Sequence, residues 1–131
     1  MVDATIEAVF LEVSIDIKLG SDPNSINLCT KGAVPIAILG SNTFDVFEVN
    51  TDTLRFAEAA VKVVGKKDPN TLCSYDDVNG DFIDDLVCHF LTVDIAGVDG
   101  ESTTATVNGE LLNGKTFEGT DTINVVKDTC N

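Results

Sequence analysis

The segment DDVNGDFIDDLVCHF, residues 76–90, combines acidic chemistry with a strand-forming run. Its first ten residues hold five Asp and one Asn, and the remainder is mostly apolar and β-branched or aromatic. Five like charges in so short a span repel one another, so the segment is either a solvated loop or a site for a cation.

The spacing of the oxygen-bearing side chains favours a cation site. Counting from Asp77, carboxylates or amides stand at positions 1, 3, 5 and 9, which are Asp77, Asn79, Asp81 and Asp85. Alternate spacing lets one tight loop turn several oxygens inward, and at position 7 the backbone carbonyl of Ile83 supplies a further ligand. Ca²⁺ takes 6–8 such oxygens, whereas softer metals prefer Cys or His. These five residues are therefore the predicted calcium ligands.

The loop differs from the helix-loop-helix calcium hand. Position 12 is Cys88 in place of a bidentate Glu, and the strand-like run DLVCHF follows. Phe82 stands where similar loops usually carry Gly, which costs strain if that residue is left-handed. A solvated Asx-rich turn is the alternative interpretation. Six further carboxylates could complete the metal's coordination shell, and the sequence does not choose among them: Asp22, Asp45, Asp84, Asp94, Asp99 and Asp121.

Length and charge limit the remaining choices. With 131 residues, the chain is expected to form one domain, residues 1–131. A net charge of −14 makes nonspecific binding to nucleic acid or anionic lipid unfavourable, and cations are the natural partners. No apolar run reaches the ~20 residues that a membrane-spanning helix needs, so membrane insertion is not expected.

The start of the chain and its cysteines bear on the compartment. MVDATIEAVFLEV lacks the basic region of a signal peptide, which fits a cytosolic chain or a mature fragment with an added Met. Four cysteines without a C-x-x-C pair favour two disulfides and an extracellular location. Three pairings are open, and we expect Cys73–Cys88, which closes a short loop around the acidic segment, together with Cys29–Cys130.

The hydrophobic pattern predicts strands throughout. Every odd position from Val9 to Leu19 is apolar, which indicates one long half-buried strand. Pro35 within AVPIAILG suits an edge strand or a bulge. Further strands are predicted at 44–49, 53–56, 61–64 and 86–93. The run FAEAAVKVVGKK alone is compatible with a helix, and its valines pull it back toward strand.

The C-terminal third predicts a meander. Asn108-Gly109 and Asn113-Gly114 are dipeptides suited to tight hairpin turns. Eight or nine short strands with regular turns predict an all-β fold, an antiparallel β-sandwich of immunoglobulin-like or jelly-roll-like type or a related barrel, that carries the calcium-binding loop. Residues 1–8 are expected to be a flexible or exchanged N-terminal segment.

Several segments together resemble a known module. IDIKLGSDPNSIN, GAVPIAILGSNTFDV, TLRF, DVNGDFIDDLVCHF and GTDTINVV occur in an order similar to that of a repeated calcium-loop β-module of secreted and surface proteins of bacteria and archaea. The likeness runs from about Val13 to Val126. It implies an extracellular β-module with Asp77, Asn79, Asp81, Ile83 (carbonyl) and Asp85 as calcium ligands. Leu19 replaces the module's common Pro, and Phe82 its common Gly.

Catalytic motifs do not emerge from the sequence. His89, the single histidine, lies in an alternating strand, and no nucleophile elbow, HExxH or phosphate-binding loop is present. We therefore expect no enzyme but a calcium-stabilised structural, adhesion or assembly module of the cell surface. Its expected partners are further copies of itself or neighbouring modules. The segment Val9–Leu19 is expected either to be buried within its own domain or to add as a strand to a second molecule. The alternative is a carbohydrate-binding module with a glycan partner, although the chain has no Trp, one Tyr and seven Phe expected in the core.

Overall fold

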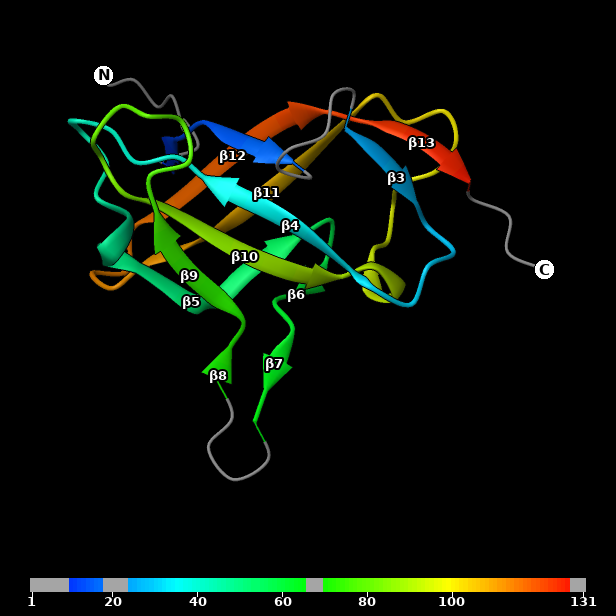
Figure 1. Ribbon diagram of the computed structural model, residues 1–131, viewed down its shortest axis with the longest axis horizontal. Coiled ribbons are helices and arrows are strands. Elements are labelled where there is room, and N and C mark those ends of the chain that lie inside the picture. Colours follow the sequence, from blue (N-terminus) through cyan, green and yellow to red (C-terminus); the bar gives the residue numbers. More distant parts are fainter. Residues whose placement is uncertain (1–9, 18–23, 66–69, 128–131) are drawn as a thin grey trace, which may run out of the picture.

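The computed structural model describes residues 10–17, 24–65 and 70–127, and over these residues the chain is an all-β sandwich (Figure 1). The larger sheet has the order β1 (Phe10–Glu12), β12 (Thr116–Thr122), β11 (Thr104–Leu111), β5 (Val49–Phe56) and β6 (Ala59–Ala60). The second sheet has the order β2 (Ile15–Ile17), β4 (Ala33–Ile38), β10 (Asp85–Leu91) and β9 (Cys73–Asp76). The predicted all-β sandwich with antiparallel sheets is confirmed.

Smaller elements complete the described part of the chain. β13 (Asn124–Lys127) pairs in parallel with β3 (Ser25–Asn27), and β7 (Val63–Val64) pairs with β8 (Asn70–Thr71) in a hairpin that projects from the sandwich (Figure 1). Two short 3₁₀ helices are η1 (Val46–Glu48) and η2 (Thr92–Asp94).

Aromatic and branched side chains from both sheets form the core. Phe56 of β5 packs against Phe90 of β10 with ring centroids 5.9 Å apart, so the two sheets meet directly. Phe117 of β12 packs on Phe44 at 5.5 Å. The alternation of β11, in which every second residue is buried, shows how a period of two directs one face of the sheet into this core.

The long first strand is corrected by the structure. Within the alternating segment, the described residues 10–17 are split: β1 pairs in parallel with β12, and β2 pairs antiparallel with β4 in the other sheet. The chain changes sheets at Val13, whose N–H still donates to Glu118. Gly119 permits this crossing, because a Cβ there would lie 2.7 Å from the Ile15 side chain. A period of two reports which face is apolar and carries no information about which sheet a strand joins.

Pro35 lies in an interior strand and not at an edge, contrary to expectation. It pairs with His89 in β10. The His89 N–H donates to Leu72, on the side of β9, so Pro35 and His89 form a pair without mutual hydrogen bonds. On the other side, the described pairing with β2 ends at Ile17 and Ile36. The missing N–H of Pro35 therefore interrupts no described ladder hydrogen bond.

The two Asn-Gly dipeptides have different structures. Asn113-Gly114 forms the predicted turn between β11 and β12, with Gly114 at φ 88°. Asn108-Gly109 does not turn the chain but lies inside β11, where Asn108 pairs with both Glu118 and Arg55. Gly109 is needed there for space, since a Cβ would lie 2.9 Å from the side chain of Leu54.

A further strand prediction needs correction. Residues 46–48 form η1 instead of strand, because the Asp45 side chain accepts a hydrogen bond from the N–H of Phe47 and caps a helical turn. In the helix-compatible run, Ala57 and Glu58 have positive φ and connect β5 to β6 by a tight turn. No α-helix occurs in the three described ranges, so the strand tendency of the valines prevails.

Candidate metal-binding loop

The acidic segment is the loop of a β-hairpin. β9 and β10 pair antiparallel, with Asp76 opposite Asp85, and residues 77–84 connect them. β10 is buried along its first four residues. The loop is thus attached to one of the most firmly packed strands of the sandwich.

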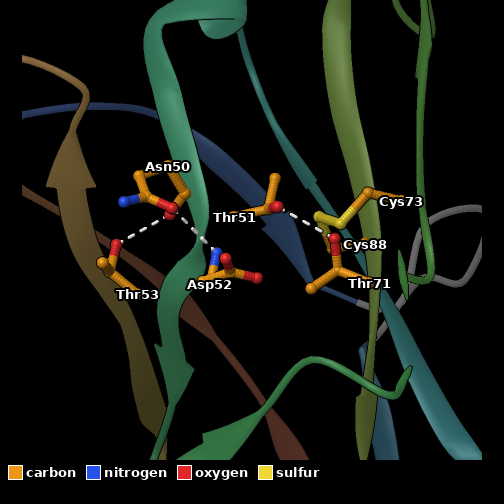
Figure 2. Close-up of a disulfide and its surroundings, with 7 residues drawn as sticks. All are labelled: Asn50, Thr51, Asp52, Thr53, Thr71, Cys73 and Cys88. Carbon is orange, nitrogen blue, oxygen red and sulfur yellow. Dashed lines mark hydrogen bonds between the residues drawn. A yellow bond between two sulfur atoms is a disulfide. The ribbon is translucent and has the colours of Figure 1, made fainter. Parts of the chain in front are cut away.

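A disulfide closes the same hairpin, as expected. Cys73 and Cys88 face each other across β9 and β10, with Cα atoms 4.1 Å apart. Beside the bridge, the Thr51 and Thr71 hydroxyls form a hydrogen bond of 2.8 Å that connects β5 to β8 (Figure 2). The predicted Cys29–Cys130 bridge involves a residue outside the described ranges.

Asp77 organises the backbone of the loop. Its Oδ1 accepts the N–H groups of Gly80 (2.9 Å) and Asp81 (3.2 Å), and its Oδ2 accepts the N–H of Phe82 (2.9 Å). Burial acts to raise the pKa of this carboxyl, but the backbone hydrogen bonds, that from Phe82 first, outweigh it and hold the pKa below its usual range. Asp77 therefore carries its negative charge at neutral pH.

Asn79, Asp81 and Ile83 continue the loop by local hydrogen bonds. Asn79 Oδ1 accepts the N–H of Asp81 at 3.3 Å, and Asp81 Oδ1 accepts the N–H of Ile83 at 3.0 Å. Each side chain thereby curls back over the residue two positions later, a turn typical of Asn and Asp. The alternating positions of the loop are the ones that turn their side chains in this way.

Asp85 forms the floor of the loop. It is fully buried, and its Oδ1 accepts the N–H of Gly40 at 2.8 Å while its Oδ2 accepts the N–H of Val78 at 3.0 Å. Gly40 follows β4 and touches the loop so closely that a Cβ would overlap the carbonyl oxygen of Asp84. A buried carboxylate needs such donors or a cation, because desolvation disfavours its charge.

Three carboxylates converge. One oxygen each of Asp77, Asp81 and Asp85 lies within 4.8 Å of the others, an arrangement that could hold a metal ion. No other Asp or Glu from the described ranges joins this group. Asp45 and Asp99 instead accept backbone N–H groups in their own turns, and Asp121 accepts the N–H of Ile17. Asp22 lies outside the described ranges.

The backbone at Phe82 has the conformation that its position suggested. Phe82 has φ 66° and Gly80 has φ 77°. The side chain of Phe82 is 96% exposed, so no packing explains a bulky residue in a left-handed conformation. The hydrogen bond from the N–H of Phe82 to Asp77 stabilises this strained backbone conformation.

Sequence reasoning missed Gly40. Its contribution is a backbone N–H and the absence of a side chain, neither of which belongs to an oxygen-ligand pattern. The only available indication was an isolated Gly at the end of a predicted strand, which often marks a close approach of two backbones.

Comparisons with known proteins add no relative. A scan against protein-family models, a search of curated proteins and a search of solved structures each returned no match. Among the described residues, no helix has the length and apolar character to cross a membrane.

Proposed function

We propose that this chain is a non-enzymatic, extracellular structural module whose acidic hairpin loop binds Ca²⁺. The observation that carries the proposal is the convergence of Asp77, Asp81 and Asp85 within 4.8 Å in a loop already folded by its own hydrogen bonds. Three carboxylates this close repel one another strongly without a cation, and a preformed loop loses little entropy when one binds.

The donor set favours Ca²⁺ over other metals. The converging side chains are carboxylates, with the amide of Asn79 and the carbonyl of Ile83 proposed to complete a set of hard oxygens. The nearest cysteines, Cys73 and Cys88, are in a disulfide and offer no thiolate. Ca²⁺ tolerates irregular geometry and several protein oxygens, whereas Mg²⁺ requires a near-ideal octahedron and retains most of its water.

Two observations support a stable extracellular role. The Cys73–Cys88 bridge is of the kind that persists in oxidising compartments. Ca²⁺ is abundant outside cells, so a loop that needs it to offset its carboxylates suits that location. We further propose that the module serves in assembly or adhesion at a surface.

Calorimetric titration tests the metal site. We expect wild-type protein to bind one Ca²⁺ and to bind Mg²⁺ far more weakly. Asp81→Asn removes one charge from the cluster, keeps a side-chain acceptor for the N–H of Ile83, and should weaken Ca²⁺ binding at least about tenfold. Asp99→Asn is the matched control, because Asp99 accepts the N–H of Glu101 in a similar turn outside the cluster. Equal Ca²⁺ affinity in all three proteins would refute the site.

Sedimentation velocity tests the assembly role. We expect larger species to form as protein concentration rises in Ca²⁺, and to dissociate in chelator if the loop supports the assembling surface. A monomer at every concentration, with and without Ca²⁺, would reject self-assembly while leaving the metal site intact.

A further inference from the structure

Two aromatic rings stack on the surface of the sandwich. Phe47 of η1 and Tyr75 of β9 have ring centroids 4.3 Å apart and planes inclined by 22°. Phe47 is 50% exposed and Tyr75 is 44% exposed, so the pair presents a large aromatic surface to solvent. The sequence predicted Phe47 to be a core residue, and the structure corrects this. The stack joins β9, at the edge of the four-stranded sheet, to η1, which directly precedes β5 of the five-stranded sheet.

The pair is held rigidly by its surroundings. In η1, Val46 is buried, Asp45 caps the N–H of Phe47, and the carbonyl of Glu48 accepts the N–H of Leu112 at 2.7 Å. On the other side, the Cys73–Cys88 bridge fixes β9 two residues before Tyr75. A preformed surface of this kind loses little conformational entropy when a ligand binds.

Acidic residues flank Phe47 along the chain. Asp45 and Glu48 lie on either side of Phe47 in and beside η1, and both are exposed. An aromatic ring attracts cations to its face through its quadrupole, and nearby carboxylates add to that attraction. Arginine satisfies both features, because its planar guanidinium stacks on rings and donates to carboxylates.

We propose that the Phe47–Tyr75 pair, with Asp45 and Glu48, binds an arginine side chain of a basic partner protein. Charge complementarity decides the occupant. A second copy of this chain has a single arginine, Arg55, and so offers this surface little of the side chain that fits it, and an anionic polymer would be repelled by the carboxylates. The inference does not depend on the metal site.

Tyrosine emission provides a direct probe. Tyr75 is the single tyrosine and the chain has no tryptophan, so intrinsic fluorescence reports on this surface alone. We expect a hexa-arginine peptide to change the emission saturably at about 0.15 M ionic strength, with weaker binding as salt rises. Hexaglutamate and the neutral sugar cellohexaose should leave the emission unchanged.

Ring and charge variants separate the contributions. Phe47→Leu keeps an apolar side chain and removes the ring face, and should weaken hexa-arginine binding about 3- to 30-fold. Phe82→Leu is its control, because Phe82 is exposed but stacks on no ring within the described residues. Asp45→Asn with Glu48→Gln should also weaken binding. Its control is Asp99→Asn with Glu101→Gln, since Asp45 and Asp99 cap similar turns and Asn preserves the cap.

The outcomes are distinct. Selective loss in the Phe47 and Asp45/Glu48 variants supports the proposal. Equal binding by Phe47→Leu and Phe82→Leu, or equal loss in both charge pairs, would overturn it by showing nonspecific attraction to an acidic protein. A response to cellohexaose without one to hexa-arginine would overturn it in favour of a glycan surface. Thermal melts of each variant, which alter exposed residues only, confirm that the comparison is between folded proteins.

Discussion

Gly40 donates its backbone N–H to Asp85 Oδ1 at 2.8 Å, although the two residues are 45 positions apart. The contact joins the end of β4 to the first residue of β10. It fixes the buried carboxylate that forms the floor of the acidic loop, so the loop depends on a neighbouring strand as well as on its own hairpin.

Gly40→Ala should therefore destabilise the fold and disturb the loop. The new Cβ would overlap the carbonyl oxygen of Asp84, and relieving such an overlap typically costs about 1–3 kcal/mol. Urea unfolding measures this loss. Gly32→Ala is the matched control, because a Cβ there meets only the Thr30 hydroxyl, at 3.5 Å. If both variants have the urea unfolding midpoint of the wild-type protein, Gly40 does not approach the loop as closely as the structure indicates.

The disulfide should contribute to stability on the scale of a short closed loop. Cys73 and Cys88 are 15 positions apart, for which chain entropy suggests about 3 kcal/mol. The double variant Cys73→Ala/Cys88→Ala should lower the free energy of unfolding by about that amount. Non-reducing peptide mapping of the wild-type protein should recover the two cysteines in one linked fragment; recovery of either one linked to another cysteine would contradict the pairing.

Asp16 should make stability depend on pH. Burial first, and then the negative charge of Asp121, raise the pKa of its carboxyl above 3.8. The folded state therefore binds this proton more tightly than the unfolded state does. Protonation of Asp16 adds its full contribution to the free energy of unfolding below pH 3.8, and this contribution is lost as the pH rises through the raised pKa. Asp16→Asn removes the repulsion and should stabilise the protein at pH 7 by about 0.2–1 kcal/mol.

Asp121→Ala should change the stability at pH 7 in the opposite direction to Asp16→Asn. Asp121 accepts the N–H of Ile17 and the side-chain amide of Asn24, so its loss leaves two donors without that acceptor and should destabilise at pH 7. Thermal melts from pH 3 to pH 7 compare the two variants. If Asp16→Asn follows the wild-type profile throughout, the two carboxylates do not interact.

The conformation of the acidic loop was the feature that the sequence predicted best, because it depends on local interactions. Alternating Asp and Asn side chains fold back on their own backbone, so Asp77, Asn79 and Asp81 need no distant partner for their geometry. The left-handed conformation at Phe82 followed from the same local pattern. Gly40 did not, because its contribution depends on how two strands approach in space.

The sequence predicted which segments form strands better than it predicted which sheet each strand joins. The alternation between Val9 and Leu19 indicates apolar faces, yet β1 and β2 join different sheets at a crossing that Gly119 permits. Asn108-Gly109 shows the same limit, since this dipeptide suits a turn but lies inside β11, where Leu54 leaves no room for a Cβ at Gly109. The exposed pair Phe47–Tyr75 depends on tertiary contact and had no local pattern.

Ca²⁺ bound to the folded acidic loop should stabilise the whole sandwich. A ligand that binds only the native state adds about 2.7 kcal/mol at a hundredfold excess over its Kd, which corresponds to roughly 10 °C in Tm for a chain of this size. Differential scanning calorimetry of wild-type protein in Ca²⁺ and in chelator measures it directly. We expect Tm to fall by roughly that amount in chelator, and Asp81→Asn to lose most of the difference. Identical wild-type melts in the two conditions would mean that Ca²⁺ does not bind the native loop.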